Sequence, residues 1–169
     1  MTGSLAFLLL LLQTPPETYT VTLTLSGPNC EGCKQDIERR ARHISGVVSV
    51  TAEVNVAKKT GSAVLAVNEN SAISRTSIER ALSQFTLTGA TLTLRGEVTA
   101  VDGAGIDFKA KASGQAHVVT RSEAKAEAAA FDALRAAGKG KYQIVADLIA
   151  LPEGEQALRL KSYTETTYK

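Results

Sequence analysis

Cys30 and Cys33 are the residues of this 169-residue chain whose type and spacing are best suited to chemistry. They are its only cysteines, and two residues separate them. Two thiolates this close can converge on one soft metal ion, with Cu(I) favoured and Zn(II) and other thiophilic ions competing. The same pair can work as a redox couple, or form a structural disulfide that closes a very small loop and stabilises little. All three kinds of chemistry stay open at this point.

A metal site built on this pair would be an open one. Structural zinc sites use four protein ligands, whereas two thiolates leave the coordination incomplete. An open site suits transfer between partners better than permanent storage. His43 lies ten residues beyond Cys33 on one predicted helix, about 15 Å away at 1.5 Å per residue, so it is not expected to be a ligand. His117 has no second Cys or His near it in the sequence and is not expected to be one either.

The elements that position the cysteines follow from hydrophobic periodicity. Residues 19–26 alternate apolar and hydroxyl side chains, as in a half-buried strand, and a turn at 27–29 follows. Cys33, Ile37, Ala41 and Ile44 recur at helical spacing, which predicts a helix over about 33–43. A hairpin over 48–67, a helix opened by Thr76 and Glu79, and a strand from Phe85 complete a βαββαβ order. That order is typical of a ferredoxin-like domain.

A second unit is expected after it. The pattern predicts strands over 91–101, with Gly96 inside the first, then 106–112 and a short one ending at Val119. An Ala-rich helix over 123–137, capped by Thr120 and Glu123 and closed by Gly138, precedes strands over 142–151 and 157–163. The βββαββ order fits a small OB-like β-barrel. The predicted fold class is therefore α+β, a ferredoxin-like domain at 17–89 followed by a barrel domain at 90–169, with residues 85–94 as one strand that could serve both.

The first unit resembles the heavy-metal-associated (HMA) domain of copper chaperones, metal-pumping ATPases and periplasmic mercury-binding proteins. The resemblance covers residues 19–88 and is carried by the Gly-x-x-Cys-x-x-Cys of Gly27, Cys30 and Cys33, by Ile37, and by Ser45-Gly46-Val47 with Ser49-Val50. The family usually has Met where Pro28 stands. Because that Met packs beneath the loop, the difference concerns the shape of the loop and not the thiols.

The resemblance implies a function as well as a fold. It implies that Cys30 and Cys33 bind Cu(I), or Zn(II) or Hg(II), and pass it by ligand exchange to a thiol-bearing acceptor protein such as a metal-transporting ATPase. A protein of this kind is not an enzyme. The family often places an aromatic residue or Lys beside the metal at the start of the last strand, which makes Phe85 the candidate lid of the site. The basic helix around Arg39 is either a solvated face or a docking patch for an acidic partner.

Two alternative functions remain. A thiol-disulfide redox protein would use the same two cysteines, although thioredoxin-like proteins carry a downstream proline facing the disulfide. The prolines here, at 15, 16, 28 and 152, are not suitably placed. The other alternative is a cell-envelope interaction protein whose barrel binds a partner.

The N-terminal residues and the net charge indicate where the protein is located and which partners are not expected. Residues 1–16 contain an apolar run from Leu5 to Leu12, shorter than the ~20 residues of a membrane span. It predicts an export signal, and therefore a periplasmic or extracellular protein that meets the membrane only through that signal, although no Lys or Arg precedes Lys34. The formal net charge is +2, without the basic excess expected for nucleic-acid binding.

Overall fold

The computed structural model describes residues 17–103, 105–111, 113–151 and 155–167. The predicted leader at 1–16 lies outside them. Eight strands and three helices form in the described residues: β1 Thr18–Ser26, α1 Cys33–Ala41, β2 Val47–Asn55, β3 Thr60–Asn68, α2 Arg75–Ala81, β4 Thr86–Val101, β5 Ile106–Ala110, β6 Ala116–Thr120, α3 Lys125–Ala137, β7 Gly140–Ala150 and β8 Gln156–Glu165. Within these ranges no helix has both the length and the apolar character needed to cross a membrane.

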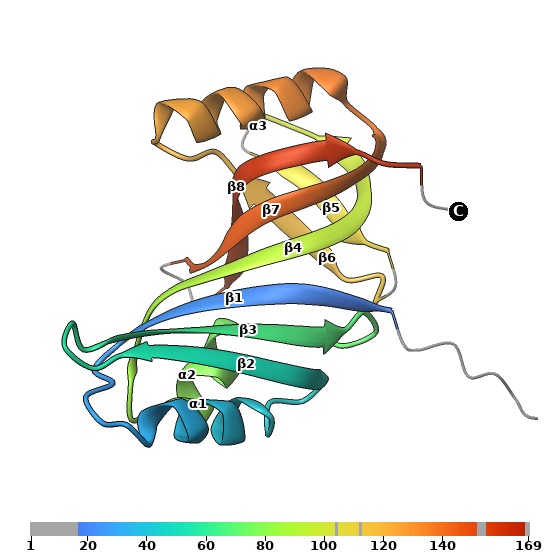
Figure 1. Cartoon of the computed structure of the whole chain (residues 1–169). Coiled ribbons are helices and arrows are strands. Elements are labelled where there is room, and N and C mark those ends of the chain that lie inside the picture. The colour runs from blue at the N-terminus through green and yellow to red at the C-terminus, as the bar shows by residue number, and fades with distance from the viewer. Residues whose placement is uncertain (1–16, 104, 112, 152–154, 168–169) are drawn as a thin grey trace, which may run out of the picture.

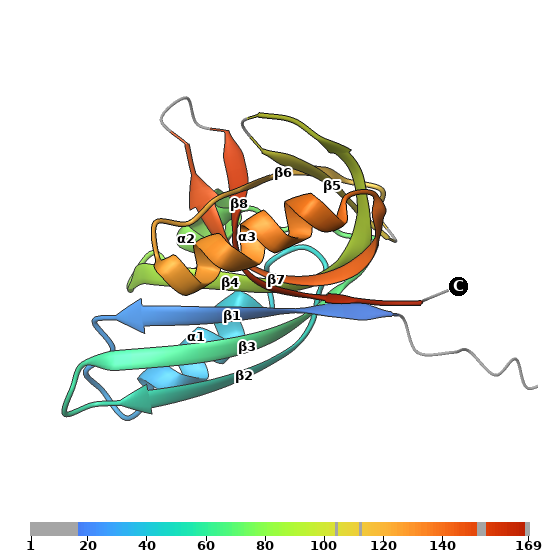
Figure 2. The same cartoon turned by 90° about the horizontal axis from the view of Figure 1, so that it is seen from above.

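The strands join into one sheet that closes on itself at one end. Their order is β2-β3-β1-β4-β5-β6-β8-β7, and an additional pairing of β4 with β7 closes β4, β5, β6, β8 and β7 into a barrel (Figure 1). The strands β1, β3 and β2 extend from the barrel side by side, with β2 at the outer edge (Figure 2). Helix α1 packs on β2 and β3 of this extension, α2 contacts α1 and the strands β4 and β7, and α3 packs on β8 of the barrel.

Strand β4 belongs to both parts of the sheet. Its residues Thr91–Thr93 pair with β1 and also with β7, and its residues Gly96–Val98 pair with β5 and also with β7. A residue cannot pair with two strands at one edge. Strands β1 and β5 therefore lie end to end along one edge of β4, while β7 occupies the other.

The predicted fold class is wrong because of this shared strand. A ferredoxin-like domain followed by an OB-like barrel would be two successive units, whereas the described residues form a mostly β structure with a closed five-stranded barrel and extra strands attached to it. Alternation within one strand shows which side chains face the core. It carries no information on which strands lie along its two edges. The sequence indicated that residues 85–94 could form one strand serving both units, but not that β4 pairs with β1 along one edge and closes a barrel with β7 along the other.

A single hydrophobic cluster runs through the barrel and the extension. Tyr19, Val21, Leu23 and Leu25 of β1 point inward as the alternation predicted, and Ile37 of α1 packs against the same cluster. The cluster continues into the barrel through Leu92, Leu94, Val98, Phe108, Leu134, Ile144 and Leu158. Because the core is continuous, burial of apolar surface holds the two parts together as well as stabilising each one.

Both predicted capping boxes are wrong by a few residues. Helix α2 begins earlier than expected, because Ser74 accepts a hydrogen bond from the Ser77 amide and the Ser77 hydroxyl accepts one from the Ser74 amide. Helix α3 begins at Lys125 without a side-chain cap on its N-cap residue. The predicted end of the helix is confirmed: α3 ends at Ala137, and Gly138 is its C-cap with a φ of 72°, which glycine adopts readily.

Candidate functional site

The loop that carries the cysteines connects β1 to α1. It leaves β1 at Gly27, which has a φ of 106°, a conformation that favours glycine. The Gly27 amide donates a hydrogen bond of 2.9 Å to the carbonyl oxygen of Lys59 in the β2–β3 turn. Lys59 itself has a positive φ of 51°. The turn between β2 and β3 therefore lies beside the cysteine loop and fixes its first residue.

Pro28 anchors the loop to the sheet. It is buried, and a Cβ placed on Gly61 of β3 would lie 3.1 Å from its Cγ and 3.5 Å from Cδ1 of Ile37. The proline ring therefore packs over the backbone of β3 next to α1. A rigid residue with a fixed φ under the loop narrows the positions that the following cysteines can take.

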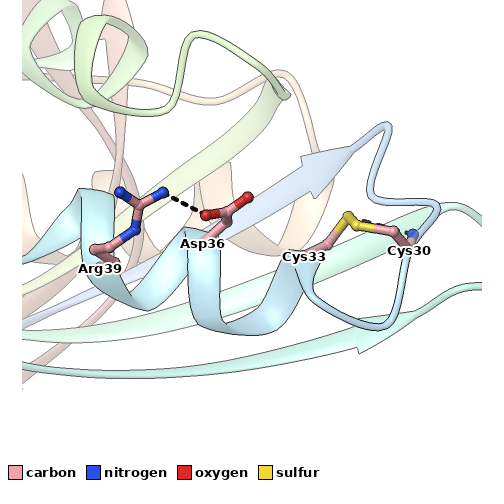
Figure 3. The surroundings of a disulfide bond; sticks show 4 residues. All are labelled: Cys30, Cys33, Asp36 and Arg39. Atoms are coloured by element: carbon pink, nitrogen blue, oxygen red, sulfur yellow. Dashed lines mark hydrogen bonds and ion pairs between the residues drawn. A yellow bond between two sulfur atoms is a disulfide. The ribbon is translucent and has the colours of Figure 1, made fainter.

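Cys30 and Cys33 form a disulfide at the start of α1, with their Cα atoms 5.3 Å apart (Figure 3). The two cysteines differ in access, because residue Cys30 is exposed whereas residue Cys33 is only 4% exposed. The Cys30 amide donates a hydrogen bond of 3.2 Å to Sγ of Cys33. Cys33 also occupies the inward position of the helix face predicted from Ile37 and Ala41, and all three side chains are buried. The site therefore has one exposed cysteine and one buried cysteine.

The surface of α1 beyond the cysteines is charged. Arg39 donates a hydrogen bond of 2.5 Å to Asp36, and this contact holds the pKa of the Asp36 carboxyl below its usual range (Figure 3). The pair is exposed and contributes little stability. Glu38 accepts a hydrogen bond of 3.1 Å from the Ala52 amide, which ties α1 to the outer strand β2. The docking role of this basic helix stays a prediction.

Phe85 lies at the same end of the sheet as the cysteine loop. Ser26, the last residue of β1, pairs with Thr86 of β4, so Phe85 continues β4 beyond this pair toward the side where Gly27 continues β1. Its ring is half-buried and packs against the hydrophobic core. That placement is compatible with the predicted lid and also with an ordinary core role, so the lid stays a prediction.

The histidines lie apart from the cysteines. His43 is exposed beyond the end of α1, and His117 is on β6 of the barrel, where burial lowers its pKa. Among the described residues, no group of three or more His, Cys, Asp and Glu side chains is placed to hold a metal ion. The metal ligands expected from the sequence are the two thiols alone.

Sequence reasoning missed a second polar site, where the β3–α2 loop meets the barrel. Glu69 is buried there beside Tyr19, Arg95, Lys111 and His117. In the sequence Glu69 directly follows β3, where a polar residue is typical of an ordinary turn. The groups around it come from β1, β4, the β5–β6 connection and β6, so no local motif could have announced the site.

Comparison with known proteins gave no match, whether to a protein-family model, to a curated protein or to a solved structure.

Proposed function

We propose that the reduced protein binds one soft metal ion, Cu(I) in the first place, between the thiolates of Cys30 and Cys33. The observation that carries this proposal is that one backbone arrangement brings both sulfur atoms together, with a Cα separation of 5.3 Å. A metal–sulfur bond of about 2.3 Å allows two thiolates to lie up to about 4.6 Å apart across one ion. Reduction of the disulfide therefore needs only a small separation of the sulfur atoms to admit the ion, and the disulfide form has no thiolate to offer.

The difference in access between the two cysteines supports transfer of the ion by ligand exchange. An incoming thiolate from an acceptor protein can reach the metal beside exposed Cys30, while buried Cys33 keeps its bond to the ion. The acceptor's thiolate adds to the metal, and the Cys30–metal bond then breaks. The acceptor is a thiol-bearing protein of the metal-transporting ATPase kind, and the protein acts as a carrier and not as an enzyme. Zn(II) and Hg(II) are the competing ions.

A second candidate function is thiol-disulfide exchange, and the disulfide itself favours it. A substrate thiolate would attack the exposed Sγ of Cys30, form a mixed disulfide and release Cys33 as a thiolate. The Cys30 amide already points at Sγ of Cys33 and would stabilise that leaving charge. A second substrate thiolate would then displace Cys30, so that two substrate thiols become one disulfide and the protein holds two thiols.

The metal proposal is tested by native mass spectrometry of the reduced protein titrated with Cu(I), Zn(II) and Hg(II). We expect one Cu(I) per chain and loss of tight binding in both Cys30→Ser and Cys33→Ser. His43→Gln is the matched control and should bind like the wild type, because His43 lies away from the thiols. Unchanged affinity in Cys30→Ser would show that the two thiols do not form the site.

The redox candidate is separated by an insulin-reduction assay with dithiothreitol. A metal carrier needs a reducible disulfide but no catalysis of exchange, so we expect no acceleration over the reductant alone. A rate comparable with that of a thioredoxin would make redox exchange the first candidate.

A further inference from the structure

A small cavity lies where the β3–α2 loop meets the barrel. Its volume is about 20 Å³, enough for about one water molecule. Residues of β1, the β3–α2 loop, β4, β5, the β5–β6 connection and β6 line it, so it joins the sheet extension to the barrel. Glu69 supplies its buried carboxyl group, and the residue as a whole is 8% exposed. Within the described residues, Oε2 of Glu69 has no hydrogen-bond partner.

Charged and titratable groups face Glu69 from every side of this cavity. Glu17 precedes β1, and its backbone carbonyl accepts a 2.9 Å hydrogen bond from the Glu69 amide. Lys111 follows β5, and its Nζ lies 2.9 Å from Oε2 of Glu17. Besides Glu69 and Lys111, the groups lining the cavity that carry or can gain a charge are Tyr19 on β1, Arg95 on β4 and His117 on β6.

The contacts of Glu17 and Lys111 cross from the extension to the barrel. The Lys111 amide donates a 2.8 Å hydrogen bond to the carbonyl oxygen of Arg95, so Lys111 is fixed to the barrel while its ammonium group reaches Glu17. Glu17 is held in turn by the Glu69 amide. We refer to the contacts among Glu17, Glu69 and Lys111 as the junction.

We propose that Glu69 is a proton-controlled latch of this junction. When Glu69 is protonated, its carboxyl group donates a hydrogen bond to the carboxylate of Glu17. The Lys111 ammonium group forms an ion pair with the same carboxylate. When the proton leaves to solvent, the buried carboxylate of Glu69 faces the carboxylate of Glu17, whose side chain is 61% exposed and in direct contact with the Lys111 ammonium group. The junction then loosens, and the β5–β6 connection separates from the β3–α2 loop.

The titration of the two carboxyl groups supports this order of events. Burial, followed by hydrogen bonding to Glu17 and repulsion by its charge, raises the pKa of Glu69 above 4.5. Hydrogen bonding from Lys111 is the main cause that lowers the pKa of Glu17. Of the two, Glu69 is therefore the carboxyl that holds the proton. Burial raises the pKa of Tyr19 to about 12, which removes it from this pH range.

The sign of the effect follows from linkage. A carboxyl whose pKa is raised on folding stabilises the folded state below its unfolded pKa and loses that contribution as the pH rises through the folded pKa. Glu69 therefore weakens the protein as the pH rises from about 4.5. Glu17 has the opposite sign and loses its contribution as the pH falls below 4.5. His117, whose pKa is lowered by burial, makes stability rise with pH up to 6.5, so the contribution of Glu69 must be isolated with a variant.

Glu69→Gln is that variant, because its amide copies the donor of the protonated carboxyl and cannot ionise. We expect the folding equilibrium constant of the wild type, divided by that of Glu69→Gln, to be constant in acid and to fall as the pH rises above 4.5. The fall should be tenfold for each unit by which the Glu69 pKa exceeds its unfolded value. Hydrogen exchange, corrected for intrinsic rates, should show protection lost at the Lys111 amide of the wild type over the same range. The Gly27 amide, far along β1, is the internal control and should keep its protection.

A direct titration keeps the proposal falsifiable should the variant fail to fold. The carboxyl carbon of Glu69, followed by NMR in the wild type, should titrate above 4.5, and Glu17→Gln should move that pKa down. A Glu69 carboxyl that titrates at or below the ordinary glutamate value would overturn the latch. So would a wild-type to Glu69→Gln ratio that stays constant across the pH range.

Discussion

Gly96 of β4 is a position where one added methyl group should be costly. It pairs with Ala110 of β5, at the part of β4 that the barrel uses on both edges. A Cβ built on Gly96 would lie 2.3 Å from the carbonyl oxygen of Lys109 and 2.6 Å from two ring atoms of Phe108. Phe108 is fully buried, so its ring has no free space to move into.

The magnitude follows from which atoms must move. Ordinary carbon contacts begin near 3.4 Å, so the methyl group must gain about 1 Å from a backbone oxygen, and β4 and β5 must separate. Overpacking of this kind costs about 1–3 kcal/mol. Ala is favoured over Gly inside a regular element by about 0.5–1 kcal/mol, which offsets part of the cost. We expect Gly96→Ala to lower the free energy of unfolding by about 1–2 kcal/mol.

Urea unfolding followed by far-UV circular dichroism measures this change. Gly103→Ala is the matched control, because no atom lies within 4 Å of a Cβ at that position. The control should stay within about 0.5 kcal/mol of the wild type. If Gly96→Ala proves as stable as Gly103→Ala, the close approach of β5 and the Phe108 ring to β4 is wrong.

Four further predictions concern helix α2, the boundary between the two parts and the lid. Arg75→Ala should cost about 1–3 kcal/mol in thermal unfolding, because its guanidinium bonds backbone carbonyls of β4 and β7 at 3.3 and 3.4 Å. Ser74→Ala should cost about 1 kcal/mol in the same assay through loss of the capping box, while a cost near zero would contradict the cap. Residues 17–89 and 90–169 should each fail to give a dispersed NMR spectrum when expressed alone, because the boundary cuts β4 and the common core, while two dispersed spectra would support the domain division. Phe85→Ala should leave one ion per chain and speed metal extraction by a competing thiol; a large loss of apo stability, about 3–5 kcal/mol, with unchanged extraction would make Phe85 a core residue.

The sequence predicted those parts of the structure that depend on local periodicity. The alternation at 19–26 gave the inward face of β1, and the helical spacing of Cys33, Ile37 and Ala41 gave the buried face of α1. The position of the cysteines between these two elements followed directly. These features succeed because burial imposes a period on neighbouring residues, and that period can be counted.

The parts that failed depend on partners distant in sequence. The chain does not reveal that Leu92 pairs with Val21 on one side and Ala146 on the other, which is what makes one strand serve two structures. The helices α2 and α3 begin at other residues than predicted. Several Ser, Thr and Glu residues near each start could cap the helix, and tertiary packing selects among them. The site around Glu69 could not be predicted for the same reason, because Lys111, which lines the same cavity, lies in a turn that is distant in the sequence.

The shared strand β4 also sets an order on the making of the protein. The edge of Thr91–Val98 that faces β7 has no partner until Gly140–Asp147 have been synthesised. At about 5–20 residues per second, the stretch from Val98 to Asp147 takes roughly 2–10 s to translate. During that interval the nascent chain presents a row of unpaired amides and carbonyls, while the opposite edge can already pair with β1 and β5. The same strand that unites the finished fold is therefore the place where a growing chain is open to pairing with another molecule.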